Sequence, residues 1–138
     1  MFKLKTLTQA LACTLLLSAG WVQAETPQDF LSSYQAAAKA ADTKFQGFSA
    51  SRGEQFFKTT HGNDWSCASC HTSNPATIGK HASTDKAIDP LAPAANPKRF
   101  TNPRKVEKWF KRNCKDVLSR ECTALEKGDI LTFLMAIQ

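Results

Sequence analysis

The chain has 138 residues, of which 42% are hydrophobic and 22% charged, with a formal net charge of +6. This composition is typical of one globular domain and excludes a multidomain enzyme, a disordered chain and a membrane bundle. The first residues have the pattern of an export signal, because Lys3 and Lys5 precede an apolar stretch that ends at Val22-Gln23-Ala24, a small-residue cleavage site. We therefore predict a signal peptide at 1–24 and one mature domain at 25–138.

Removing residues 1–24, which hold two lysines and no acidic residue, leaves 114 residues and lowers the charge from +6 to +4. That charge is too small to indicate nucleic-acid binding. Nothing after Glu25 approaches the roughly 18 apolar residues of a membrane span. Cys13 leaves with the signal; the alternative, a lipidated Cys13, conflicts with the apolar run that continues past it. For a bacterial protein, this pattern predicts the oxidising periplasm.

The first half of the mature chain predicts two helices. Thr26 followed by Pro27 is a typical helix start, and apolar residues recur at helical spacing until near Gly47. Ser51 and Glu54 have the spacing of a capping box and predict a short helix that stops near 61–62.

The second half begins with an irregular segment and ends with two more helices. Residues 74–103 contain five of the six prolines and show no sustained period. Thirty such residues are unusual in so small a domain unless they wrap a ligand or cofactor. Asn102-Pro103 starts a helix that reaches Val117, and a capping box at Thr123 starts the last helix. No stretch shows strand-like alternation, so we predict an all-α fold of four or five short helices.

Residues 67–71 form the sequence C-x-x-C-H, the attachment motif of haem c. On a helical turn Cys67 and Cys70 lie on one face, where two thioether bonds can hold one porphyrin edge. His71 then reaches the iron as the proximal ligand. A zinc site would require a second ligand pair at short spacing, and a thioredoxin-like pair would require a preceding strand. The motif therefore predicts one covalently bound haem c.

The other cysteines of the mature chain, Cys114 and Cys122, are expected to form a disulfide. A loop of about nine residues closed in this way loses roughly 2.5 kcal/mol of unfolded-state entropy on the chain-entropy model. A structural cross-link is the favoured interpretation, and a redox-active pair is the alternative.

The sixth ligand of the iron distinguishes the function classes. A small electron carrier often uses a methionine, but the only methionine after the signal is Met135, in the last helix near the apolar stripe. The candidates are therefore His61, His81, Asn113 or an open position. For each histidine, contact with solvent or with a propionate is the simpler interpretation.

Asn113 lies on the apolar stripe of the helix that begins at 103. Its spacing from Val106 and Trp109 places its amide on the same face as the residues expected to be buried, which also include Phe110 and Val117. A buried amide without a partner costs about 1 to 3 kcal/mol, so it must bind something, and the haem iron is one candidate. The alternative is that Asn113 caps its helix at the disulfide turn.

The chain resembles the sphaeroides haem protein family over about residues 48–138. The resemblance rests on C-x-x-C-H, on 79–81, 90–93 and 96–100, and above all on Arg-Asn-Cys at 112–114 followed by Arg-Glu-Cys at 120–122. It implies a small class I cytochrome c-like fold, here with an additional N-terminal helix. It also implies one haem, a proximal His71, a labile distal Asn113, and a Cys114–Cys122 disulfide beside it.

The resemblance further implies that Asn113 leaves on reduction, so that ferrous haem can bind O2, NO or CO. An amide oxygen is a hard donor that suits Fe(III) better than Fe(II). Such a protein couples electron transfer to the binding of diatomic ligands. If it is an enzyme, its substrate is expected to be oxygen or nitric oxide; otherwise it is an electron carrier. The alternative is a simple electron carrier with His61 or His81 as permanent sixth ligand.

Basic residues are concentrated in and before the helix that begins at 103. They form either an ordinary solvated face or a docking surface for an acidic redox partner. The family resemblance implies a dihaem cytochrome c and a membrane b-type cytochrome as partners. The residues are Lys98, Arg99, Arg104, Lys105, Lys108, Lys111, Arg112 and Lys115.

Overall fold

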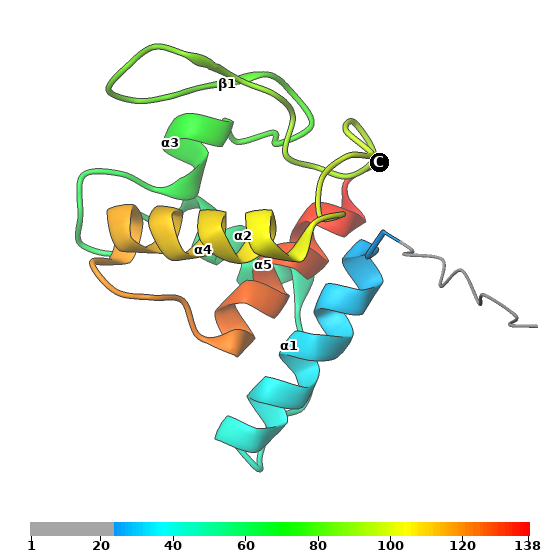
Figure 1. Ribbon diagram of the computed structural model, residues 1–138. Coiled ribbons are helices and arrows are strands. Elements are labelled where there is room, and N and C mark those ends of the chain that lie inside the picture. Colours follow the sequence, from blue (N-terminus) through cyan, green and yellow to red (C-terminus); the bar gives the residue numbers. More distant parts are fainter. Residues whose placement is uncertain (1–23) are drawn as a thin grey trace, which may run out of the picture.

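The computed structural model describes residues 24–138 and folds them into five helices and one two-stranded hairpin (Figure 1). The predicted signal peptide lies, except for Ala24, outside the described residues. Within 24–138 no helix is long and apolar enough to cross a membrane. The all-α prediction is confirmed. The elements are α1 (Pro27–Ala41), α2 (Ala50–Lys58), α3 (Cys67–His71), β1 (Gly79–Lys80), β2 (Ala87–Ile88), α4 (Pro103–Leu118) and α5 (Ala124–Ala136).

Side-chain caps fix where the longer helices begin. Thr26, Asn102 and Thr123 accept hydrogen bonds from backbone N–H groups in the first turns of α1, α4 and α5, as their positions in the sequence predict. The predicted cap of α2 is wrong. Ser49, not Ser51, has the extended backbone and accepts the Arg52 N–H, so the helix begins two residues earlier.

Helices α2 and α5 cross in close contact. A Cβ on Gly53 would lie 1.9 Å from the Asp129 carbonyl oxygen, so the two backbones meet at a residue without a side chain. Beside it the Asp129 carboxylate, only 5% exposed, accepts the Ser49 N–H and two N–H groups of Arg52. Packing and a fully bonded buried carboxylate therefore lock α2 onto α5.

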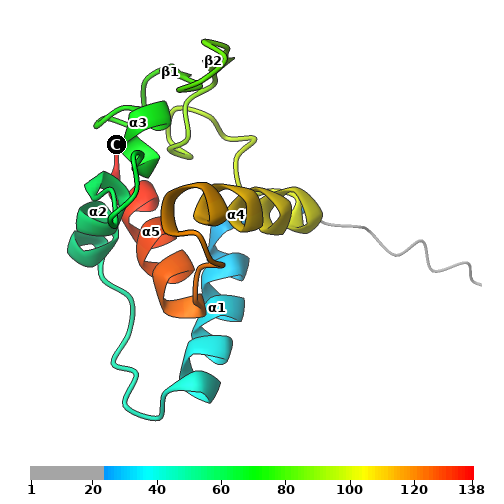
Figure 2. The ribbon, with the colours of Figure 1, turned by 90° about the vertical axis from the view of Figure 1, so that its left-hand side faces the viewer.

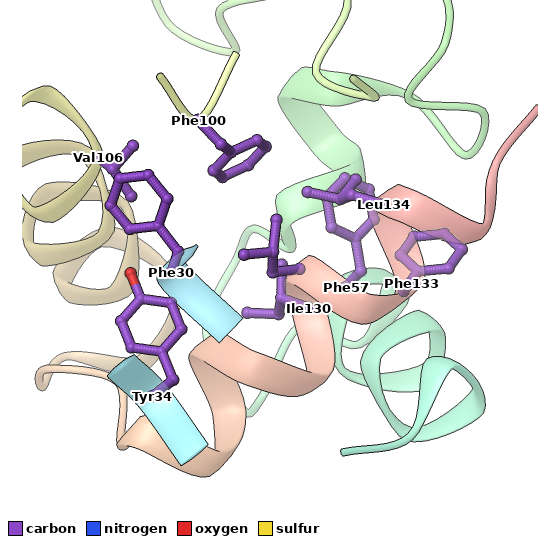
Figure 3. Close-up of a cluster of buried hydrophobic side chains, with 9 residues drawn as sticks. Phe30, Tyr34, Phe57, Phe100, Val106, Ile130, Phe133 and Leu134 are labelled. Carbon is purple, nitrogen blue, oxygen red and sulfur yellow. The ribbon is translucent and has the colours of Figure 1, made fainter. Parts of the chain in front are cut away.

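The additional N-terminal helix packs on α5 and completes the core. Figure 3 shows Phe30 of α1 beside Val106 of α4. Both belong to one buried cluster with Tyr34 of α1 and Ile130 of α5. Toward the edge of this cluster, Tyr34 donates a 2.6 Å hydrogen bond to Glu107 of α4. Lys127 of α5 donates to the other oxygen of the same carboxylate, also at 2.6 Å. One polar network thus joins α1, α4 and α5.

The irregular segment predicted between 74 and 103 contains a small antiparallel hairpin, in which β1 pairs with β2. Strands of two residues are too short to show a period in the sequence, so the hairpin was not predictable from alternation. Near the end of this segment, Phe100 has a φ of 54°, which is costly for a bulky residue. Its ring lies in the core cluster (Figure 3), and this burial offsets the backbone strain.

Candidate haem site

The C-x-x-C-H motif forms a helix of its own. Ser66 caps α3 and exchanges hydrogen bonds with Ser69, so residues 67–71 adopt one helical turn. This turn holds Cys67 and Cys70 one turn apart, and neither forms a disulfide. Burial raises the pKa of the Cys67 thiol to about 11. Two thiols on one face, followed directly by an imidazole, are the donor set that haem c requires.

His71 is half-buried, and its surroundings favour the neutral imidazole. Desolvation, followed by the positive charge of Arg99, lowers the pKa of His71 to about 4. A neutral imidazole is the form that ligates iron. The ring of Phe57 from α2 lies 6.3 Å from the His71 ring, centre to centre.

The hairpin contacts the backbone of α3 at Cys70. A Cβ on Gly79 would lie 2.2 Å from the Cys70 carbonyl oxygen, so β1 contacts α3 backbone to backbone. Arg99 fastens the second half of the same segment, since its guanidinium donates to the carbonyls of Asp89 and Pro90 at 2.6 and 2.9 Å. The 72–102 segment is therefore an ordered wall beside α3 and not a free loop.

Exposed apolar side chains lie in the connections before and after α3 and on α4. Trp65, Ile78 and Trp109 are 41%, 67% and 49% exposed, whereas most other large apolar residues are buried or half-buried. Trp65 lies two residues before Cys67, and Ile78 directly precedes β1, so two of these side chains flank the attachment motif. Together with the thiol and imidazole donors, these residues fit a covalently attached haem.

The exposure of Trp109 corrects one expectation, since the sequence placed it in the buried stripe of α4. Val106, Cys114 and Val117 are buried, but Trp109 lies toward the edge of that stripe, with the Arg112 guanidinium 5.2 Å above its ring. The 3.6-residue period selects a broad face of a helix, and only part of that face meets the core.

Asn113 lies well inside α4. The helix continues to Leu118 and is capped by Ser119, so Asn113 is not the helix cap that the sequence allowed as an alternative. The residue is half-buried, and its amide makes no side-chain hydrogen bond within residues 24–138. α3 lies above the C-terminal half of α4 in Figure 1, and Figure 2 keeps α3 above α4. Asn113 therefore offers a free amide on the half of α4 that lies below α3.

A disulfide joins Cys114 to Cys122, with their Cα atoms 5.6 Å apart. Both cysteines are buried, and the bond ties the residue next to Asn113 to the turn before α5. Lys111 and Glu121 form an ion pair across the same turn, at 3.2 Å.

The other candidate ligands have partners of their own. The Nε2 atom of His61 lies 2.8 Å from the Phe56 carbonyl, and its ring packs on the Phe56 ring at 4.3 Å. His81 is exposed next to β1, with its Nδ1 atom 3.3 Å from the Ser83 hydroxyl. Met135 packs against the core cluster from α5.

Comparison with known proteins identifies the family. A cytochrome c-type protein, SHP, from Cereibacter sphaeroides is 38% identical over 136 residues, which are 94% of this chain and 99% of that protein. The chain belongs to the sphaeroides haem protein family. Residues 43–134 also match a family described as a domain of unknown function, DUF1924. Cytochrome c'' from Methylophilus methylotrophus is another relative, 42% identical over 74% of each chain.

Solved structures of SHP and of cytochrome c'' share the fold. Oxidised cytochrome c'' of M. methylotrophus superimposes with a TM-score of 0.73 at 38% identity, over 81% of this chain and 94% of that one. Oxidised SHP, described as an oxygen-binding cytochrome c, gives 0.71 at 38% identity, over 82% and 98%. A solution structure of cytochrome c'' that addresses haem-ligand detachment gives 0.69.

These comparisons confirm the class I cytochrome c-like fold and the family resemblance. This member of the sphaeroides haem protein family is accordingly a c-type cytochrome, which carries covalent haem c and transfers electrons.

Proposed function

We propose that this cytochrome carries one haem, attached to Cys67 and Cys70, with His71 as proximal ligand and Asn113 as labile distal ligand. Release of Asn113 on reduction opens the sixth coordination position to O2, NO or CO. The sequence contains one C-x-x-C-H motif, which supports a single haem. When bound, haem supplies an iron that exchanges one electron and whose ferrous form takes diatomic ligands.

The unbonded amide of Asn113 carries this proposal. Its amide makes no hydrogen bond within the described residues, and since no buried side-chain nitrogen or oxygen there lacks a partner, the amide is open to solvent and to a ligand. An amide oxygen binds Fe(III) weakly and Fe(II) more weakly still, so its hold depends on the oxidation state. The description of SHP as oxygen-binding and the ligand detachment studied in cytochrome c'' support the same chemistry here.

A carrier with a permanent histidine ligand is the second candidate. His61 would have to give up its contact with the Phe56 carbonyl, and His81 would have to leave an exposed turn. Each move costs about the free energy of one hydrogen bond and reorders a turn, which makes Asn113 the simpler ligand.

Optical spectra test the choice. The oxidised and reduced protein, each with and without carbon monoxide, are compared with the variants Asn113→Ala, His61→Ala and His81→Ala. We expect reduced wild type to take up carbon monoxide at once, and only Asn113→Ala to change the oxidised spectrum. A low-spin reduced protein that ignores carbon monoxide, with an oxidised spectrum that only a histidine variant changes, contradicts the proposal.

We further propose that the protein acts in the periplasm after removal of residues 1–24. The basic start, apolar stretch and cleavage site of the sequence support this, as does a disulfide in a cytochrome with attached haem. Fractionation of cells that express the full chain should yield a periplasmic haem protein, and its mass should be that of a chain that begins at Glu25 and carries one haem. A haem protein that keeps residues 1–24 in the cytoplasm contradicts it.

We propose that the outer face of α4 receives acidic redox partners, namely a dihaem cytochrome c and a membrane b-type cytochrome. Arg99 is half-buried and bonded to carbonyls, so it is left out of this surface. Electron-transfer rates with such a donor should fall as salt rises; salt-independent rates contradict the docking surface. Its exposed residues are Lys98, Arg104, Lys105, Lys108, Lys111, Arg112 and Lys115.

A further inference from the structure

Asn63 bonds two distant parts of the chain to each other. It lies in the connection between α2 and α3, four residues before Cys67. Its Nδ2 donates a 2.8 Å hydrogen bond to the Val117 carbonyl, near the C-terminal end of α4. The Ser119 hydroxyl, at the cap of α4, donates to Asn63 Oδ1 at 3.4 Å.

The Val117 carbonyl needs a partner from outside its helix. The last four carbonyls of an α-helix lack an intrahelical N–H, and α4 ends one residue later, at Leu118. Ser119 adopts a left-handed conformation, with a φ of 58°, and turns the chain away. Asn63 therefore satisfies a helix end from another segment, and its half-buried position strengthens the bond.

The position of this contact connects the two ligand-bearing elements. Val117 lies one helical turn after Asn113, on the same side of α4, and the Asn63 backbone leads directly into the motif that ends at His71. The disulfide ties the same end of α4 to the turn before α5, not to the segment before α3. Asn63 is thus a short, non-covalent connection from the haem-attachment segment to the distal helix.

We infer that Asn63 is a positioning residue for Asn113: its side chain holds the C-terminal end of α4 against the segment that precedes α3. The strength of this hold sets how readily Asn113 leaves the sixth position. The inference rests on the proposed function, since it assigns a control to the labile ligand proposed there.

Cyanide binding to the oxidised haem protein tests the inference, because cyanide must displace the sixth ligand. Asn63→Ala removes the hydrogen bond to Val117, and the nearly isosteric Asn63→Asp removes its donor while keeping its shape. The matched control is Asn102→Ala, which removes one side-chain hydrogen bond from the opposite end of α4. Both Asn63 variants should raise the cyanide association rate roughly two- to twelvefold, the range of one net hydrogen bond. Asn102→Ala should leave the rate unchanged.

Two further measurements separate positioning from general loosening. Hydrogen exchange of the backbone amides from 118 to 122 should accelerate in the Asn63 variants and not in Asn102→Ala. In an Asn113→Ala background, Asn63→Ala should have no further effect on cyanide binding.

The outcomes distinguish the two hypotheses. If Asn113→Ala alters the oxidised spectrum but the Asn63 variants bind cyanide like wild type or like Asn102→Ala, the positioning role is wrong. A further effect of Asn63→Ala without Asn113 also overturns it. If Asn113→Ala alters neither the spectrum nor the rate, the proposed function itself fails.

Discussion

The two sides of the candidate haem site are built differently. On the side of α3, α2 crosses α5 with no side chain between the backbones, and the Asp129 carboxylate is fully bonded at the crossing. On the other side, α4 has no comparably extended packing against another helix within residues 24–138. It is held by the disulfide, by Asn63 and by the network around Glu107.

This contrast matches the tasks proposed for the two sides. A ligand that stays on the iron in both oxidation states benefits from a rigid support, and α2, which is locked onto α5, contacts His71 through Phe57. A ligand that leaves must move by a small distance without unfolding the protein. A helix held at a few points can shift while the closely packed half remains in place.

Breaking the α2–α5 crossing should have the largest effect. Gly53→Val adds atoms where even a Cβ meets a backbone carbonyl at 1.9 Å, and we expect a loss of about 3 kcal/mol or more in the free energy of unfolding. Denaturant unfolding of the haem protein measures this. The control is Gln55→Val, on the exposed face of the same helix, which should cost little. Equal stability of the two variants would show that the crossing is not a rigid support.

Removing the disulfide should lower the stability by an intermediate amount and should loosen only the side of the site formed by α4. Cys114→Ala combined with Cys122→Ala should lower the free energy of unfolding by about 2.5 kcal/mol, the entropy of the closed loop. The change should also speed hydrogen exchange around 113–122 while leaving α2 protected. Uniform acceleration across both halves would contradict the separation between them.

The smallest effect is expected from the pH dependence of the network around Glu107. Burial alone would raise the pKa of Glu107, but hydrogen bonds from Lys127 and Tyr34 outweigh it and hold the pKa below its usual range. A carboxylate with a depressed pKa adds stability at pH values above its unfolded pKa, about 4.5 for Glu107, and this stability is lost as pH falls through the folded value.

Glu107→Gln should therefore flatten the loss of stability on acidification below about pH 4.5, as measured by thermal unfolding between pH 3 and 7. Glu54→Gln, in an exposed ion pair with Lys58, serves as control and should change the profile less. If the stability of Glu107→Gln depends on pH as that of wild type does, the network around Glu107 does not help to hold α4.

Local signals allowed much of the fold to be predicted. Caps at Thr26, Asn102 and Thr123 fixed three helix starts, because each acts within four residues of itself. The start of α2 was predicted wrongly because Ser49 and Ser51 can both cap a helix there. Only the extended backbone of Ser49 identifies it as the cap.

The site was predictable where chemistry is contiguous in the chain. Cys67, Cys70 and His71 form one motif, whereas Asn63 and Val117 are 54 positions apart and carry no shared sequence signal. The periodicity of α4 placed Trp109 in the core, because a period does not tell which part of an apolar face meets protein and which part is left for a cofactor.

The place of α1 also bears on where this domain can be cut. The DUF1924 match covers residues 43–134, which leaves α1 outside the segment by which sequences of that family are recognised. Yet Phe30, Tyr34 and Ala38 are buried, and Tyr34 bonds the carboxylate that also binds Lys127. A recombinant fragment trimmed to the recognised segment would expose the apolar side of α5 to water. The smallest unit that folds on its own is therefore longer than residues 43–134, the segment that matches the family.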